Sequence, residues 1–245
     1  MPQDTRVAIK VWDLPVRLFH WLIVLLLVFQ VVTGQIGGSL MEWHAYSGYA
    51  ILVLIVFRIL WGFAGSTHAR FASFLAGPAA TYRFALRLFS REAVPQVGHN
   101  PLGGWMVIAL IVSLALQAAS GLFAYDGAGA EGPLASLVSF DLSSRLSQFH
   151  RWNFKLLLVL SGVHTAAVLF HWLVKKENLI GAMFTGVKRV PEAAVRERRE
   201  ALRGTPLRRT ASREHASAYF ASPLRAFAVL ALAVLLVYLV VQGPR

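Results

Sequence analysis

The sequence predicts an all-α integral membrane protein, in which a four-helix bundle is followed by a fifth transmembrane helix near the C-terminus. Three observations lead to this prediction. Hydrophobic residues make up 56% of the 245 positions and charged residues only 15%, whereas soluble domains carry about 25% charged residues. Five apolar stretches are long enough, or nearly so, to cross a bilayer as helices. The charged residues lie mainly between these stretches, as is typical of membrane proteins.

The five apolar stretches also define the expected organisation of the chain. None shows the alternation of a strand, and a single segment in a bilayer satisfies its own backbone groups only as a helix. We expect a membrane domain over residues 1–188, a basic cytoplasmic linker over 189–221 and a C-terminal transmembrane segment over 222–245. The expected helices cover residues 16–35, 44–63, 102–124, 149–174 and 222–241.

The distribution of positive charge predicts the orientation in the membrane. Of the 24 Lys and Arg residues, 20 fall in the N-terminal segment and in the second and fourth connections between spans. This asymmetry places the N-terminus in the cytoplasm and the C-terminus on the outer side. Residues 66–100 are expected to form an amphipathic segment at the membrane interface. Residues 188–221 are expected to form a solvated, partly helical linker near acidic lipids rather than a specific site for nucleic acid or a partner. The net charge of +12 therefore indicates membrane topology rather than binding of nucleic acid.

The absence of cysteine narrows the chemistry. A chain with no cysteine has no disulfides, no iron–sulfur cluster held by its own thiolates and no covalently attached c-type haem. Five histidines nevertheless lie within or at the ends of the expected spans, where ionisable residues are rare and usually functional. They are His20, His44, His150, His164 and His171.

Helix geometry arranges four of these histidines in two layers. His150 and His164 are 14 residues apart, which is about 21 Å along a helix and within about 40° of the same face. His44 begins the second span at the outer side, and His20 lies near the inner start of the first. We therefore predict an outer pair, His44 with His150, and an inner pair, His20 with His164.

Two imidazoles in an apolar bundle are typical axial ligands of haem. Zinc would need more ligands than one pair supplies. A chain of histidines that relays protons is the main alternative, but it does not explain two matched depths. Two glycines are in register with the histidines: Gly34 follows His20 by 14 residues, and Gly48 lies one turn from His44. We expect both to leave space for a porphyrin.

Several segments resemble the bacterial cytochrome b561 family, which includes the b-type cytochrome subunits of nickel–iron hydrogenases. The resemblance covers about residues 10–188 and rests on WDLPVRLFHW, HAYSGYAILVLIVFRILWG, HNPLGGWMVIALIVSLALQAASGLF and HRWNFKLLLVLSGVHTAAVLFHWLVKKENLIGAMFTG. It implies four helices that hold two non-covalent b haems in the bacterial inner membrane. By the family pattern, the iron ligands are His20, His44, His150 and His164.

The function that the resemblance implies is electron transfer in a respiratory chain. The expected partners are a quinone and a periplasmic redox protein, such as a c-type cytochrome or a hydrogenase-like enzyme. Whether the chain only relays electrons or also acts as a quinone oxidoreductase stays open. Two alternatives also stay open: a proton-coupled transporter with titrating histidines, and a membrane anchor subunit of a periplasmic oxidoreductase.

Two further predictions concern the cytoplasmic side. His171, Trp172 and Lys175 are candidates for a quinone site, although Trp172 and Lys175 would serve equally as interfacial anchors. Arg58 follows His44 by 14 residues in the same span, which places it about 21 Å inward at the depth of the inner pair. We predict that it binds a haem propionate; the alternative is that it extends to the lipid headgroups.

Overall fold

A computed structural model describes residues 6–87, 98–125, 127, 129–192 and 219–243, and the chain divides into two compact units. The first unit comprises Met1–Arg17, Trp61–Val107 and His164–Ser222. The second comprises Leu18–Leu60, Ile108–Val163 and Pro223–Arg245. Four of the long helices contribute residues to both units.

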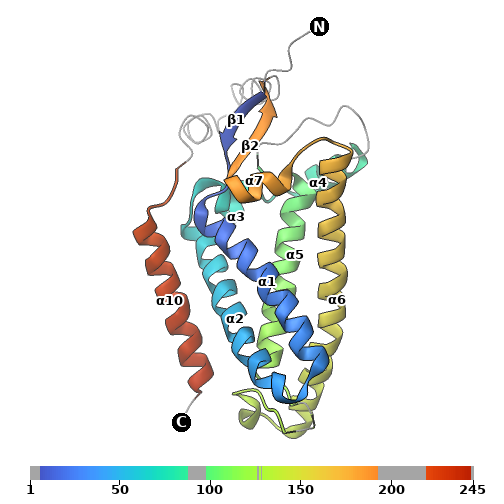
Figure 1. Cartoon of the computed structure of the whole chain (residues 1–245), viewed down its shortest axis with the longest axis vertical. Coiled ribbons are helices and arrows are strands. Elements are labelled where there is room, and N and C mark those ends of the chain that lie inside the picture. Colours follow the sequence, from blue (N-terminus) through green and yellow to red (C-terminus); the bar gives the residue numbers. More distant parts are fainter. Residues whose placement is uncertain (1–5, 88–97, 126, 128, 193–218, 244–245) are drawn as a thin grey trace. The chain divides into compact units, whose positions relative to one another are not determined.

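Within the described residues, five helices are long and apolar enough to cross a membrane, which confirms the predicted fold class. They are α1 (Leu14–Ile36), α2 (Met41–Ala64), α5 (Pro101–Gly121), α6 (Phe140–Leu173) and α10 (Pro223–Gln242), as labelled in Figure 1.

The second unit contains the core of the helical bundle. Buried side chains from α1, α2, α5 and α6 meet in one apolar cluster, so the four helices pack around a common centre. Its members are Ile23, Ile51, Ile55, Leu114 and Leu157. A short 3-10 helix, Gly38–Leu40, joins α1 to α2, and the preceding Gly37 adopts a φ of 68° that glycine accommodates without strain.

The fourth span differs from its prediction, because α6 begins at Phe140, nine residues before the expected start. Its first turns, FDLSSRLSQ, are too polar to be recognised as part of a membrane span. Local interactions nevertheless support a helix there. The Ser139 hydroxyl accepts a hydrogen bond from the Leu142 amide, and Asp141 pairs with Arg145 one turn later.

The helix starts of the first unit are set by capping side chains. Asp13 accepts a hydrogen bond from the Val16 amide at the start of α1, and its second oxygen accepts one from the buried Trp61 indole. Asn100 caps α5 through the Gly103 amide, directly before Pro101. Side-chain acceptors and an N-terminal proline both favour a helix start.

The first unit also contains a two-stranded antiparallel sheet that was not predicted. β1 (Arg6–Lys10) pairs with β2 (Val187–Pro191), with Arg6 opposite Pro191 and Lys10 opposite Val187 (Figure 1). The sheet lies outside the apolar spans, where hydropathy carries little signal. β2 also crosses the predicted boundary between membrane domain and linker, and most of that linker, residues 193–218, lies outside the described residues.

Shorter helices complete the first unit. They are α3 (Phe71–Phe74), α4 (Pro78–Arg87) and α7 (Leu179–Thr185), with a 3-10 helix at Thr67–Ala69. α3 and α4 lie within the segment 66–100 that is expected at the membrane interface, of which residues 88–97 lie outside the described residues. α7 ends at Gly186, whose φ of 80° is the left-handed conformation that commonly terminates helices.

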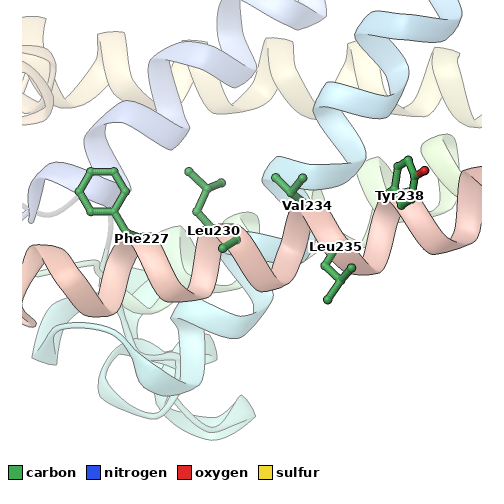
Figure 2. A pocket seen from close by; sticks show the side chains of 6 residues that line it. Phe227, Leu230, Val234, Leu235 and Tyr238 are labelled. Atoms are coloured by element: carbon green, nitrogen blue, oxygen red, sulfur yellow. The ribbon is translucent and has the colours of Figure 1, made fainter.

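Helix α10 presents a continuous apolar face. A groove of about 500 Å³ follows it, lined only by residues of this helix, among them Phe227, Leu230, Val234 and Tyr238 (Figure 2). Ala233 and Val237 are the buried residues of this helix. A helix with so much exposed apolar surface suits the hydrocarbon region of a membrane.

Candidate haem-binding site

The outer pair of histidines comes together in the second unit. His44 lies in the first turn of α2, and His150 lies ten residues into α6. Their ring centroids are 6.3 Å apart and the ring planes meet at 71°. The structure therefore places side by side the two imidazoles that helix spacing assigns to one depth.

Both imidazoles direct Nδ1 toward oxygen atoms. His150 Nδ1 donates to the Gln117 carbonyl at 2.9 Å, and the Ser120 hydroxyl lies 3.2 Å from the same nitrogen. His44 Nδ1 lies 3.3 Å from the Thr33 hydroxyl, whose own proton goes to a backbone carbonyl one turn earlier. Because a carbonyl only accepts, the proton of a neutral His150 resides on Nδ1 and the lone pair on Nε2.

This arrangement fits a haem iron held between two histidines. A bond from a transition metal to an imidazole nitrogen is about 2 Å long, so rings on opposite sides of one iron have centroids about 6 Å apart. The observed 6.3 Å matches that spacing. Among the described residues, no group of three or more His, Cys, Asp or Glu is arranged to hold a metal ion by itself. A pair of imidazoles suits a metal that brings its other ligands with it, as the iron of haem does.

Two glycines stand directly against the outer pair. A Cβ at Gly34 would lie 2.9 Å from His44 Cε1, and a Cβ at Gly121 would lie 3.1 Å from His150 Cε1. Real Cβ atoms almost never approach within 3 Å of another atom, so a side chain at Gly34 would displace the ring. The sequence predicted Gly34 by its spacing, whereas Gly121 was only one of several glycines within the spans.

We expect Gly34→Ala to weaken haem retention roughly tenfold, because the added methyl moves the His44 imidazole away from its partner. The measurement is the ratio of haem to protein after purification. Gly162→Ala is the matched control, since a Cβ there meets nothing within 4 Å. Equal haem contents in the two variants would contradict a role for Gly34 beside His44.

The inner pair is divided between the two units. His20 belongs to the second unit, where its ring meets that of Trp21 edge-on at 5.0 Å, and His164 belongs to the first. The pairing of these two residues therefore stays a prediction. The spacing argument requires His150 and His164 to lie on one continuous helix. They do, because α6 runs without interruption from Phe140 through both residues.

Arg58 and Gly48 both lie in α2 within the second unit. Arg58 is buried, with 3% of its surface exposed, so its side chain does not lie on the outside of the bundle. A Cβ at Gly48 would meet the Gln30 amide nitrogen at 3.2 Å. Gly48 thus stands against Gln30, and that side chain donates in turn to the His44 carbonyl at 2.8 Å.

Residues 11–186 match the model of a protein family described as prokaryotic cytochrome b561. This chain belongs to that family. Among its relatives, a probable Ni/Fe-hydrogenase B-type cytochrome subunit of Rhizobium leguminosarum bv. viciae is 24% identical over 74% of this chain and 89% of its own length. The corresponding subunit of Rhodobacter capsulatus is 26% identical over 74% and 81%. A probable superoxide oxidase CybB of Yersinia pestis is 25% identical over 66% and 88%. No solved structure gives a significant match.

As a member of the cytochrome b561 family, the chain is a b-type cytochrome that binds haem b and transfers electrons in a membrane. Its five apolar helices make it a multi-pass membrane protein. Haem b is not covalently attached, in agreement with the absence of cysteine. The spacing of the His44 and His150 rings is compatible with a haem iron bound between them.

The residues predicted for a quinone site lie at the end of α6 in the first unit. His171 Nδ1 lies 3.0 Å from a Glu177 carboxylate oxygen, and its Nε2 lies 3.4 Å from the Asn100 amide. Trp172 is 45% exposed, and Lys175 stands over the ring of Phe170. The structure therefore joins His171 to a polar cluster and leaves Trp172 facing outward.

Lys188 of β2 completes this polar cluster, 3.8 Å from the Glu177 carboxylate. Burial raises the pKa of Glu177, but the hydrogen bond with His171 and the positive charge of Lys188 outweigh it, so the net pKa lies below the usual range. Burial also lowers the pKa of Lys188, and Glu177 offsets this only in part. The cluster holds a carboxylate at the end of α6.

Sequence reasoning missed the polar residues that surround the outer pair. A signal was present, because hydroxyl and amide side chains stand out in otherwise apolar spans. Spacing alone did not tell which of them face a histidine, since serine and threonine also bond to their own helix. The missed residues are Gln30, Thr33, Ser113, Gln117, Ser120 and Asn153.

Proposed function

We propose that this b561 protein carries electrons across a bacterial inner membrane through two b haems, between a periplasmic redox partner and the quinone pool. The observation that supports it most strongly is the outer pair. His44 and His150 stand 6.3 Å apart with their Nδ1 atoms toward oxygen acceptors, which leaves both Nε2 atoms for iron. A proton relay would not require this matched orientation.

At the outer site, the residues of the chain bind and orient the cofactor. A bound haem supplies reversible one-electron chemistry. His44 and His150 would hold the haem iron between them, which disfavours binding of oxygen there. The hydroxyl of Thr33 and the carbonyl of Gln117 fix the tautomers of the two rings.

The second haem of the proposal rests on the spacing of the sequence. His164 follows His150 by 14 residues on the uninterrupted helix α6, about 21 Å further along its axis. His20 supplies the other proposed ligand from α1. Two haems at these depths would divide the thickness of the membrane into two shorter electron-transfer steps.

The proposed partner and orientation rest on charge and on the relatives. The asymmetry of 20 among 24 Lys and Arg residues favours a cytoplasmic N-terminus and places the outer pair near the periplasm. Several relatives bear the name Ni/Fe-hydrogenase B-type cytochrome subunit. We therefore propose a hydrogenase-like enzyme as the periplasmic partner, with a c-type cytochrome as the alternative.

Quinone reduction is proposed to take place near His171, Trp172 and Lys175. We expect the double variant His171→Ala, Lys175→Ala to lose most quinone reduction, because the quinone must gain protons as well as electrons. The measurement is the rate at which dithionite-reduced haem is reoxidised by decylubiquinone. Trp172→Phe is the control for the alternative in which Trp172 serves only as an interfacial anchor. A double variant that reoxidises at the wild-type rate would exclude these residues.

The inner ligand on α6 is proposed to be His164 rather than His171. His171 lies 21 residues from His150, which is about 31 Å along a helix. The proposed distance between the two histidine layers is about 21 Å, the length that 14 helical residues span. His164→Ala is expected to lose one haem for each chain, and His171→Ala to keep both, as measured by the pyridine haemochrome. The reverse result would exchange the roles of the two residues.

One experiment tests the function as a whole. The full chain, purified in detergent, is expected to show the absorption bands of haem b and two haems for each polypeptide, with two separate midpoint potentials in a redox titration. Absence of haem would reject the proposal and favour the transporter. Haem that exchanges no electrons with a quinone would favour a membrane anchor.

A further inference from the structure

We propose that Asn153 is a positioning residue that acts through Gln117 on His150 and thereby sets the reduction potential of the outer haem. This proposal rests on the proposed function, because it assumes that His150 is an iron ligand. It concerns three side chains on two neighbouring helices, all within the second unit.

Asn153 lies three residues after His150 on α6 and is 5% exposed. Its amide nitrogen donates to the Ser113 carbonyl at 2.9 Å and to the Gln117 side-chain oxygen at 2.7 Å. Its oxygen accepts from the Ser113 hydroxyl at 3.2 Å. Since a backbone carbonyl only accepts, the orientation of the Asn153 amide is determined. These three hydrogen bonds use most of the donors and acceptors of the Asn153 side chain.

Gln117 connects this contact to the histidine. Its side chain accepts from Asn153, and its backbone carbonyl accepts from His150 Nδ1 at 2.9 Å. Gln117 lies in the last turns of α5, where the Ser120 hydroxyl shares the same carbonyl. Asn153 thus fastens α6 to α5 at the residue whose carbonyl orients the imidazole. A shift of either helix at this point would change the hydrogen bond to His150.

The two axial histidines are held unequally. His150 has a carbonyl at 2.9 Å, whereas His44 has a hydroxyl at 3.3 Å that is already committed as a donor to its own helix. A hydrogen bond from Nδ1–H to a strong acceptor makes an imidazole a better electron donor. A better donor stabilises ferric iron and lowers the potential. The contact through Asn153 therefore keeps the potential of the outer haem low.

The test is a redox titration of the purified holoprotein, with the low-temperature EPR spectrum as a second readout. Asn153→Leu keeps the branched shape and the number of heavy atoms, although its methyl groups are bulkier, and makes none of the three hydrogen bonds. It is expected to raise the potential of the outer haem by about 59 mV, which is a tenfold change in the ratio of oxidised to reduced haem for one electron. Its EPR signal should shift as the imidazole plane turns, while the other haem is unchanged.

A second variant keeps the test independent of folding. Gln117→Leu retains the backbone carbonyl and both bonds between Asn153 and Ser113, but removes the link between Asn153 and Gln117. It is expected to shift the same haem in the same direction. Because the two residues act in series, the double variant should shift it no further than the larger single variant.

The matched control is Ser143→Ala, which removes another buried hydrogen bond of α6, to the Phe123 carbonyl at 2.8 Å. It should leave both potentials unchanged. Unchanged potentials in Asn153→Leu and Gln117→Leu, equal shifts in both haems, or an equal shift in Ser143→Ala would overturn the inference. Loss of haem from the wild-type chain would instead reject the proposed function, so the two failures are distinguishable.

Discussion

His150→Gly is expected to remove one of the two proposed haems and to leave the other in place. The substitution deletes the imidazole that stands 6.3 Å from His44, and an iron with one protein ligand in an apolar bundle is bound weakly. Loss of an axial ligand is a larger change than loss of a supporting hydrogen bond, which already costs 10–100-fold in metal affinity. The measurement is the haem content for each polypeptide.

Three further variants make this prediction specific to the pair. His44→Gly is expected to lose the same haem, so the double variant should lose no more than either single one. Added imidazole is expected to restore the missing absorption band in either single variant, because the space left by the ring remains. His68→Gly is the control, since that histidine belongs to the first unit and the outer pair to the second. Loss of different haems in the two single variants would refute the pairing.

The sequence was sufficient to predict the spans, and that His44 and His150 lie at one depth, because both depend on one-dimensional regularities; their role as iron ligands stays a prediction. Hydropathy defines segments that must be helical in lipid, and a 14-residue spacing gives depth along a helix. The structure brings His44 and His150 together as that spacing predicted. It also places Gly34 against His44, as expected from its register with His20.

Features that depend on packing between helices could not be predicted in the same way. The hydrogen bonds that link Asn153 to Gln117, and Gln117 to His150, join residues more than 30 positions apart. Sequence spacing gives their helical faces but not the rotation of α5 against α6, which decides which polar groups meet. The sheet of β1 and β2 was missed for a related reason, because its strands are separated by most of the chain.

Arg58 illustrates how burial narrows the choice between two interpretations. An arginine late in a transmembrane helix either extends along the helix to the lipid headgroups or turns into the protein. Only 3% of its surface is exposed, which favours the inward orientation. A buried guanidinium needs an anionic or polar counterpart. We propose that this counterpart includes a propionate of the inner haem. Arg58 follows His44 by 14 residues on one continuous helix, a spacing that corresponds to the depth of the inner pair.

Arg58→Leu is therefore expected to lower the midpoint potential of the inner haem. Coulomb's law gives about 1.7 kcal/mol for a unit charge about 10 Å from the iron at an effective dielectric constant near 20. This energy corresponds to a decrease of roughly 70 mV for one electron. Removing a positive charge favours ferric iron, which fixes the sign. The measurement is a redox titration that follows the two haems separately.

Two variants distinguish an interaction with a propionate from a general effect of charge. Arg58→Lys keeps the positive charge but not the two-pronged geometry of the guanidinium. It should therefore keep the midpoint potential of the inner haem close to the wild-type value and yet bind that haem less tightly. Arg145→Leu removes an exposed arginine that already pairs with Asp141, and it should shift neither haem. Because the predicted effect falls off with distance, the outer haem should move much less than the inner one. Equal shifts of both haems in Arg58→Leu would mean that Arg58 acts through the bundle as a whole and not on one propionate.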